Sequence, residues 1–407
     1  MKLDKPTTQP WLQPSAYWPQ LSAATAGLDT PFGVVSAPAL AYNAHDMLRR
    51  SHGTTIRVAS KSVRVRGVID AVLQMPGYHG VLAYTLPEAL WLAETIDDVV
   101  VGYPTVDRAA IEKLGRSEKL ARRVTLMVDS VEQLDVVDSV LGAKHETIRV
   151  ALELNASWRS KVLGYLGVYR SPVQGVADAV ALGRAIVSRP GFQLVGMMAY
   201  EAQIAGVVNR PKGKPILART VDYVQRNSTT ELHERRGAVV AALRELADLE
   251  FVNGGGTGSL ERTSSDPSVT EIAAGSGLFG PHLFDGYSHF QPAPAAAFSL
   301  SVVRKPTPDM ATLLGGGWIA SGPPAPDRMP QLAYPEGLEY VARESAGEVQ
   351  SPLKGRAAAA LAVGDRVWLR HTKAGELSEH LNEFAVVDDG RIVETLPTYR
   401  GEGKAFL

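Results

Sequence analysis

The sequence contains no cysteine. Its absence excludes disulfide bonds, thiolate metal sites and a cysteine nucleophile, and it is compatible with a reducing compartment. No apolar run approaches the ~20 residues that a membrane-spanning helix needs. The first residues, MKLDKPTTQPWLQ, have no basic region followed by an apolar core, so we expect no secretory signal and a cytoplasmic protein.

A surplus of charge of either sign is also missing. The net charge is −1 over 407 residues, which argues against nucleic acid or an anionic membrane as the main partner. Apolar residues make up 45 % of the chain, so a large core can form, and the length suggests two domains.

Short β-branched segments alternate with helical segments through the first two thirds of the chain. This alternation predicts right-handed βαβ units and a parallel sheet. Eight strands over ~220 residues fit a closed (β/α)₈ TIM-type barrel, with an open doubly wound sheet as the alternative. The expected strands are Ile56–Ala59, Gly80–Ala83, Asp98–Gly102, Val124–Asp129, Ile148–Leu154, Leu194–Tyr200, Glu250–Asn253 and Glu271–Ala274.

The pattern changes after about Phe290, where prolines and glycines separate short alternating segments. Asp388-Asp389-Gly390 is a hairpin signal within this region. We therefore expect a barrel domain over residues 30–290 and a C-terminal antiparallel β domain over residues 291–407. Residues 1–29 have no clear period and are expected to form an arm that packs on the β domain.

Lys61 lies at the exit of the strand Ile56–Ala59. Barrel enzymes keep their chemistry at this end of the strands. An amine there, partly desolvated and near Arg57 and Arg64, is biased toward its neutral, nucleophilic form. The alternative is a lysine that begins the next helix and points into water.

A glycine-rich loop, Asn253 to Ser259 (NGGGTGS), follows the seventh strand. Glycines let backbone N–H groups approach a phosphate, and barrels bind phosphates in the loops after their late strands. The loop has neither the P-loop pattern nor the dinucleotide pattern. It predicts pyridoxal phosphate or flavin mononucleotide, and Lys61 favours the first because only an aldehyde needs an amine. A glycine-rich turn without ligand is the alternative.

Several segments together resemble the fold-type III pyridoxal-phosphate enzymes. The likeness is to the D-threonine aldolase and D-serine dehydratase-like group (amino acid deaminase/aldolase), whose barrel is of the alanine racemase N-terminal type. It rests on RVASKSVR, LAYTLPEALWL, VVVGYPTVDR, NGGGTGS, KAGELSE and PTYRGEGKAFL, which begin at Arg57, Leu82, Val99, Asn253, Lys373 and Pro397.

The resemblance implies roles for individual residues. Lys61 would hold pyridoxal phosphate as a Schiff base. An arginine after the fifth strand would contact the cofactor ring, with Arg170 as the better match and Arg159 as the alternative. Tyr200, at the end of the sixth strand, would face the cofactor or else cap the barrel core. The phosphate contacts implied by the resemblance are Gly255, Gly256, Thr257, Gly275 and Ser276.

His371 follows the strand Val367–Arg370, where metal-dependent members of this group carry a histidine. Their second ligand, cysteine or aspartate two residues later, is replaced here by Lys373. A protonated lysine cannot ligate a cation, so a divalent metal is doubtful. His371 is then expected to act alone as acid or base, while Glu376 and His380 leave a different metal site conceivable.

The resemblance implies a lyase for a small β-hydroxy amino acid of D configuration. The resemblance implies retro-aldol cleavage or dehydration with deamination, and sequence does not choose between them. A racemase and a non-catalytic pyridoxal-phosphate carrier are the alternatives, and the resemblance also allows a homodimer.

Overall fold

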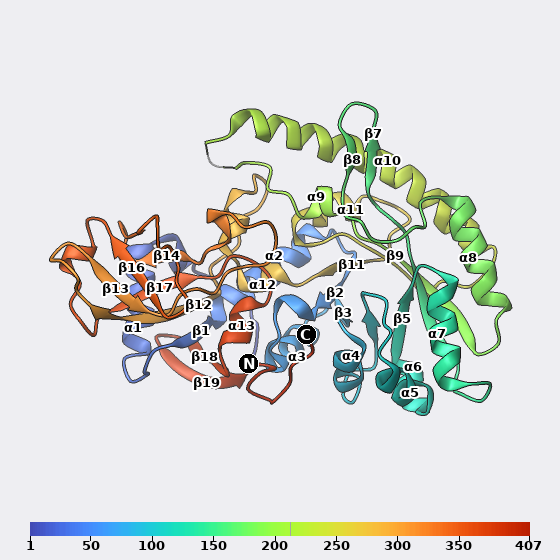
Figure 1. Cartoon of the computed structure of the whole chain (residues 1–407), viewed down its shortest axis with the longest axis horizontal. Coiled ribbons are helices and arrows are strands. Elements are labelled where there is room, and N and C mark those ends of the chain that lie inside the picture. Colours follow the sequence, from blue (N-terminus) through green and yellow to red (C-terminus); the bar gives the residue numbers. More distant parts are fainter. Residues whose placement is uncertain (212) are drawn as a thin grey trace.

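The computed structural model describes residues 1–211 and 213–407. It comprises a barrel and a separate β sheet, seen on the right and left of Figure 1. In the described part of the chain, no helix has both the length and the apolar character needed to cross a membrane.

Eight parallel strands close into the barrel in the order β10-β11-β2-β3-β4-β5-β6-β9. This confirms the predicted (β/α)₈ barrel and excludes the open sheet. The strands are β2 (Thr55–Ala59), β3 (Tyr78–Ala83), β4 (Val99–Val101), β5 (Val124–Val128), β6 (Ile148–Glu153), β9 (Phe192–Ala199), β10 (Phe251–Gly254) and β11 (Glu271–Ala274).

Helices follow the barrel strands along the chain and cover them. Thr85 caps one of them by accepting a hydrogen bond from the backbone N–H of Glu88, which satisfies a donor in the first turn. The barrel helices are α3 (Arg66–Leu73), α4 (Leu86–Leu92), α5 (Arg108–Gly115), α6 (Glu118–Arg123), α7 (Val131–Leu141), α8 (Val176–Ser188), α9 (Ala202–Ala205), α10 (Pro215–Arg244), α11 (Leu260–Ser264) and α12 (Ser276–Phe279).

An ion-paired arginine links three of the barrel strands. The Arg57 guanidinium on β2 donates to Glu271 on β11 at 2.7 Å and to Asp98 at 2.8 Å. Asn253 on β10 also donates to Glu271, at 2.8 Å. A charge this deeply buried is tolerated only when it is paired. The two carboxylates balance the charge of Arg57, and the ion pairs link the strands.

The second sheet has nine strands and is mostly antiparallel. One of them, β1, comes from the segment that we assigned to the barrel domain, and it pairs antiparallel with β12 and parallel with β18. The boundary between the two domains stays a prediction from the sequence. Strand β1 belongs by sequence to the first domain but pairs with strands of the second. The strands are β1 (Phe32–Ser36), β12 (Ala296–Arg304), β13 (Ala311–Leu314), β14 (Gln331–Tyr334), β15 (Glu339–Tyr340), β16 (Gln350–Lys354), β17 (Arg366–Arg370), β18 (Glu383–Asp388) and β19 (Arg391–Pro397).

The N-terminal arm contains a helix that the sequence pattern does not reveal, α1 (Pro14–Ala24). Its Trp18 ring lies 5.8 Å from the ring of Trp368 on β17, and the Trp368 indole donates to Ser22 at 2.8 Å. Helix α2 (Ala37–Arg50) then leads from β1 to the barrel. The arm therefore packs against the C-terminal sheet.

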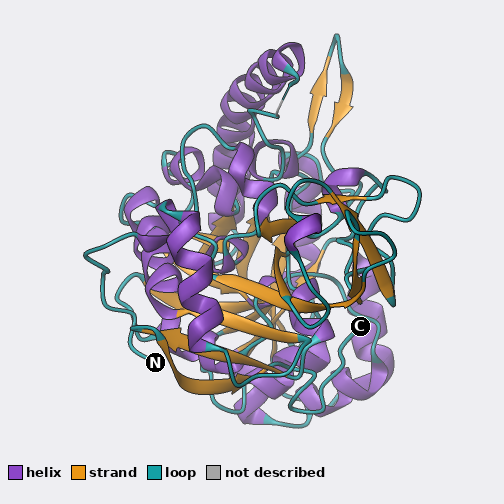
Figure 2. Cartoon of the chain, turned by 90° about the vertical axis from the view of Figure 1, so that its left-hand side faces the viewer, coloured by secondary structure: helices purple, strands orange, loops and turns teal. Residues whose placement is uncertain are grey.

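A small hairpin lies in the connection between β6 and α8. Its strands are β7 (Trp158–Ser160) and β8 (Gly164–Leu166). The hairpin projects from the molecule beside the 30-residue helix α10 (Figures 1 and 2). The C-terminal half of α10 is packed, with Val239, Val240 and Leu243 buried. This hairpin was not predicted, because each strand is only three residues long.

Candidate active site

Lys61 lies in a single turn of 3₁₀ helix, Ser60–Ser62, directly after β2. Its amine donates a hydrogen bond of 3.1 Å to the hydroxyl of Tyr103, which follows β4. We expected the charges of Arg57 and Arg64 to act on this amine, but both are ion-paired. Arg57 pairs with Glu271, and Arg64 pairs with Glu379 at 2.6 Å. Lys61 thus sits at the strand ends, inside the barrel mouth.

A cavity of about 350 Å³ lies at this mouth. The sequence-predicted residues that line it come from five separate strand ends and loops. They are Lys61, Arg170, Tyr200, Gly255, Gly256, Thr257, Gly275 and Ser276. The structure therefore brings together every predicted cofactor-binding residue, and leaves out His371.

The glycine loop is shaped closely around its neighbours. Gly255 has φ +69°, and a Cβ atom there would lie 2.6 Å from the Thr263 hydroxyl. A Cβ atom on Gly275 would lie 2.2 Å from the carbonyl oxygen of Ala59. The Thr257 hydroxyl accepts a hydrogen bond of 3.1 Å from the N–H of Gly277. Glycine is required at Gly255 in this loop and at Gly275 in the neighbouring loop after β11, so both segments keep their backbone close to their neighbours.

Glu201 holds this loop through hydrogen bonds. The sequence analysis assigned no role to this residue. Its buried carboxylate accepts hydrogen bonds from the Gly255 N–H at 2.9 Å and from Thr263 at 2.7 Å. Arg236 lies 3.5 Å away and pairs with Asp266 at 2.8 Å. A signal was present, since Glu201 directly follows Tyr200 at the end of a barrel strand.

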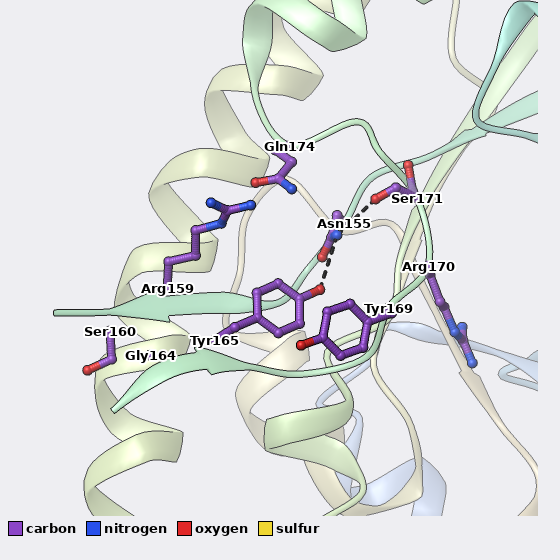
Figure 3. A pocket seen from close by; sticks show the side chains of 9 residues that line it. All are labelled: Asn155, Arg159, Ser160, Gly164, Tyr165, Tyr169, Arg170, Ser171 and Gln174. Atoms are coloured by element: carbon purple, nitrogen blue, oxygen red, sulfur yellow. Dashed lines mark hydrogen bonds between the residues drawn. The ribbon is translucent and has the colours of Figure 1, made fainter. Parts of the chain in front are cut away.

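The two candidate arginines separate clearly. Arg170 lines the Lys61 cavity and also a neighbouring cleft of about 500 Å³, whereas Arg159 lines only that cleft. Figure 3 shows the two arginines on opposite sides of the cleft, with Tyr165 and Tyr169 between them. Arg170 is therefore the arginine that can reach a ligand beside Lys61.

Arg170 also organises the groups around it. Its guanidinium carbon lies 5.1 Å from the ring centre of Tyr103 and 4.9 Å from that of Tyr200. It pairs with Glu153 on β6 at 3.4 Å. Burial raises the pKa of Glu153 to about 7, against the opposing effect of Arg170. Arg170, Tyr103 and Tyr200 thus line the cavity together, and Glu153 pairs with Arg170 without lining the cavity itself.

Tyr103 is the second site residue that the sequence analysis did not assign. It lies within the segment VVVGYPTVDR, just past the third barrel strand of the chain. Burial opposes ionisation of its phenol, but the charges of Lys61 and Arg170 outweigh burial and lower the pKa of Tyr103. Its position at a strand end was the available signal.

His371 lies outside the cavity that Lys61 lines. It is 4 % exposed, and neither ring nitrogen has a hydrogen-bond partner among the described residues. Burial, together with the charge of Arg370, lowers the pKa of His371 to about 3, so the ring is neutral at pH 7. The sequence indicated that His371 follows a strand, but it did not indicate to which side of the strand the ring points.

Lys373 and Glu376 do line the cavity. Burial and the charge of Arg328 lower the pKa of Lys373. The ring of His380 stacks 4.8 Å from that of Trp318. The described residues contain no group of three or more His, Asp or Glu side chains placed to hold a metal ion.

These residues fit a small phosphorylated aldehyde. The amine of Lys61 supplies the nucleophile that an aldehyde needs. The shape of Gly255 and Gly275, where a Cβ atom would collide, leaves backbone at the cavity wall, and the hydroxyls of Thr257 and Ser276 stand beside it. Such a set of donors suits a phosphate group.

Curated relatives include two aldolases. The chain is 24 % identical over 305 residues to a D-threonine aldolase of an Arthrobacter species, covering 71 % of this chain and 70 % of the relative. It is 30 % identical over 240 residues to a 3-hydroxy-D-aspartate aldolase of Paracoccus denitrificans, covering 58 % of this chain and 54 % of the relative. The second match thus spans little more than half of that protein.

Solved structures share the whole architecture. D-threonine aldolase from Filomicrobium marinum superposes with a TM-score of 0.75 at 21 % identity, over 92 % of this chain and 96 % of that one. D-threo-3-hydroxyaspartate dehydratase from Delftia sp. HT23 superposes with a TM-score of 0.69 at 20 % identity, over 92 % and 98 %. At these identities the likeness establishes the fold.

The family itself is established by a match that covers more than half of the chain. The model of the alanine racemase N-terminal domain matches residues 35–282. These residues include Lys61, the glycine loop and all eight barrel strands. The barrel, its lysine and the sequence match lead to one conclusion: the chain belongs to the alanine racemase N-terminal domain family.

Proposed function

We propose that this protein is a pyridoxal-phosphate-dependent lyase that acts on a small β-hydroxy amino acid of D configuration. The observation that carries the proposal is the cavity in which the Lys61 amine and the Gly255–Thr257 loop lie together. The relatives support the substrate class, because they are named as aldolases or dehydratases of such amino acids.

In this proposal Lys61 holds the cofactor, and the glycine loop with Ser276 holds its phosphate. When bound, pyridoxal phosphate draws electrons away from the α-carbon of an amino acid. Arg170, which lines the same cavity, would face the cofactor ring, and because a guanidinium does not give up a proton, it would leave the ring nitrogen without one. Lys373, which lines the same cavity, pairs with the substrate carboxylate.

Two reactions are compatible with these groups. In retro-aldol cleavage the Cα–Cβ bond breaks and the β-hydroxyl loses its proton, giving glycine and an aldehyde. In dehydration the amine of Lys61 takes the α-proton and the β-hydroxyl leaves as water, giving a keto acid and ammonia. The role of His371 as the base for the β-hydroxyl stays a prediction. Its neutral ring is buried, so it can accept a proton only from a group that reaches it.

Product analysis tests this proposal. The cofactor-loaded protein is incubated with D- and L-threonine and with D- and L-3-hydroxyaspartate, and products are separated by chiral chromatography. Glycine with an aldehyde indicates an aldolase, and a keto acid with ammonia indicates a dehydratase. The opposite enantiomer of the substrate would indicate a racemase instead. If none of the four amino acids gives a product, the proposal is wrong. The variant Lys61→Ala serves as the inactive control.

Oligomeric state and location stay predictions from the sequence. Light scattering on the purified protein tests the homodimer, and cell fractionation tests the cytoplasmic location.

A further inference from the structure

Lys61 and Tyr103 form a close pair of ionisable groups at the barrel mouth. The amine and the phenol oxygen are 3.1 Å apart, although the residues are 42 positions apart in the chain. They follow β2 and β4, which are separated in the barrel by β3. Both residues line the same cavity, so closure of the barrel is what brings them together.

Tyr200 shows which charge matters for this pair. Arg170 lies at a similar distance from both phenol rings, 5.1 Å for Tyr103 and 4.9 Å for Tyr200. Burial raises the pKa of Tyr200 despite Arg170. Burial also opposes ionisation of Tyr103, yet its pKa is lowered, and the charge of Lys61 is the largest opposing cause. Two differences therefore separate the tyrosines: the charges of Tyr103 and Glu201 add to the raised pKa of Tyr200, and Tyr103 is the one in contact with Lys61.

We propose that Tyr103 is the proton-exchange partner of Lys61. A proton passes from the Lys61 ammonium to the Tyr103 phenolate oxygen, which leaves a neutral amine and a neutral phenol. One N–H bond breaks, one O–H bond forms, and the net charge of the pair is unchanged. The cost of separating charge in a buried site is thereby avoided. Arg170, on the ring of Tyr103, stabilises the phenolate when Lys61 is protonated.

This exchange gives Lys61 the form that its chemistry requires. Only the neutral amine has a free electron pair for attack on an aldehyde carbon. Once the phenol has released its proton to solvent, Tyr103 can accept the proton that Lys61 takes from a substrate carbon, and the neutral amine is restored. The inference rests on the proposed function for the task of Lys61, and it adds a group that neither the family match nor the named relatives assign.

Ultraviolet titration of the full-length protein without cofactor tests the pair directly. Tyrosinate absorbs more strongly than the neutral phenol, and the protein has 13 tyrosines, so the signal is read as a difference between variants. We expect one phenol to ionise below the ordinary value of ~10. This step should disappear in Tyr103→Phe, persist in Tyr200→Phe, and move upward in Lys61→Met, where only the charge of Arg170 still opposes burial.

The rate of cofactor attachment is the second readout. The visible absorbance that follows addition of pyridoxal phosphate should rise more slowly in Tyr103→Phe, by about 10²-fold, a typical contribution of a positioned proton donor or acceptor. Attachment at the wild-type rate would overturn the proposal. So would a low-pH tyrosine step that survives Tyr103→Phe or Lys61→Met.

Two features keep this test decisive. If Tyr103→Phe does not fold, the wild-type titration still decides, because absence of any tyrosine ionising below the ordinary range refutes the pair. None of these measurements uses a substrate. A protein with the pair but without lyase activity would pass them and fail product analysis, so the two proposals fail separately.

Discussion

Replacing Gly255 with alanine should destabilise the protein by an amount that can be divided into two parts. The backbone at this position has φ +69°, which costs an L-residue about 1–2 kcal/mol. The added Cβ atom would also lie 2.6 Å from the Thr263 hydroxyl and 2.9 Å from Ile272. Overpacking of this kind costs about 1–3 kcal/mol. We expect a total loss of about 2–5 kcal/mol.

Gly390→Ala is the matched control for the conformational part. Gly390 has φ +71° in the turn between β18 and β19, and nothing lies within 4 Å of an added Cβ atom. This variant should therefore lose only about 1–2 kcal/mol. Since Gly255 also shapes the predicted phosphate loop, Gly255→Ala alone should weaken retention of pyridoxal phosphate.

Urea unfolding measures the first quantity, and the visible absorbance after dialysis measures the second. If Gly255→Ala loses no more stability than Gly390→Ala, then Thr263 and Ile272 do not pack against Gly255 as closely as described. If its cofactor retention equals that of the wild type, the phosphate lies elsewhere.

Four further predictions follow from the site. Borohydride treatment of the loaded protein should label one peptide, that of Lys61, and a label on another lysine would contradict the assignment. Gly256→Asp should place a carboxylate beside the phosphate, costing about 4 kcal/mol for unit charges 4 Å apart and roughly 10³ in cofactor affinity, while circular dichroism stays unchanged; equal affinity would count against this loop. The pKa of His371 is about 3 when folded and 6.5 ordinarily, so stability should fall as pH falls from 6.5 toward 3, by up to about 1.4 kcal/mol per pH unit. His371→Gln should flatten this part of the profile in difference unfolding curves, and parallel curves would refute the assignment. Because Lys373 stands where the resemblance expects a metal ligand, dialysis against a strong chelator should leave activity intact; a loss that manganese or zinc restores would reverse this view.

Much of the fold was predictable because its signals are local. Apolar β-branched segments such as Ile56–Ala59 and Ile148–Leu154 define strands wherever they occur, and the helices between them require a parallel arrangement. The eight expected strands match the eight barrel strands. Lys61 and the glycine loop were likewise visible, since a residue at a strand exit and a run of glycines are properties of short segments.

Pairing between distant strands was not predictable in the same way. The apolar residues of Phe32–Ser36 are compatible with a strand, but nothing in that segment specifies its partners. It joins the second sheet by pairing with Phe298 and Phe384, hundreds of residues later. The helix Pro14–Ala24 was hidden because its buried face is completed by Trp368 and not by a regular apolar period.

The sequence by itself indicated barrel strands with an amine at one strand end and a glycine-rich loop at another, since both features depend on neighbours in the chain. Only the tertiary structure decided which other groups meet that amine. Closure of the barrel places Tyr103 and Arg170 beside Lys61 and puts Glu201 under the glycine loop. His371, which follows β17 in the second sheet, lies outside the cavity. The reason is physical: these contacts join different strands, and their distances are set by how the sheet closes rather than by any short segment.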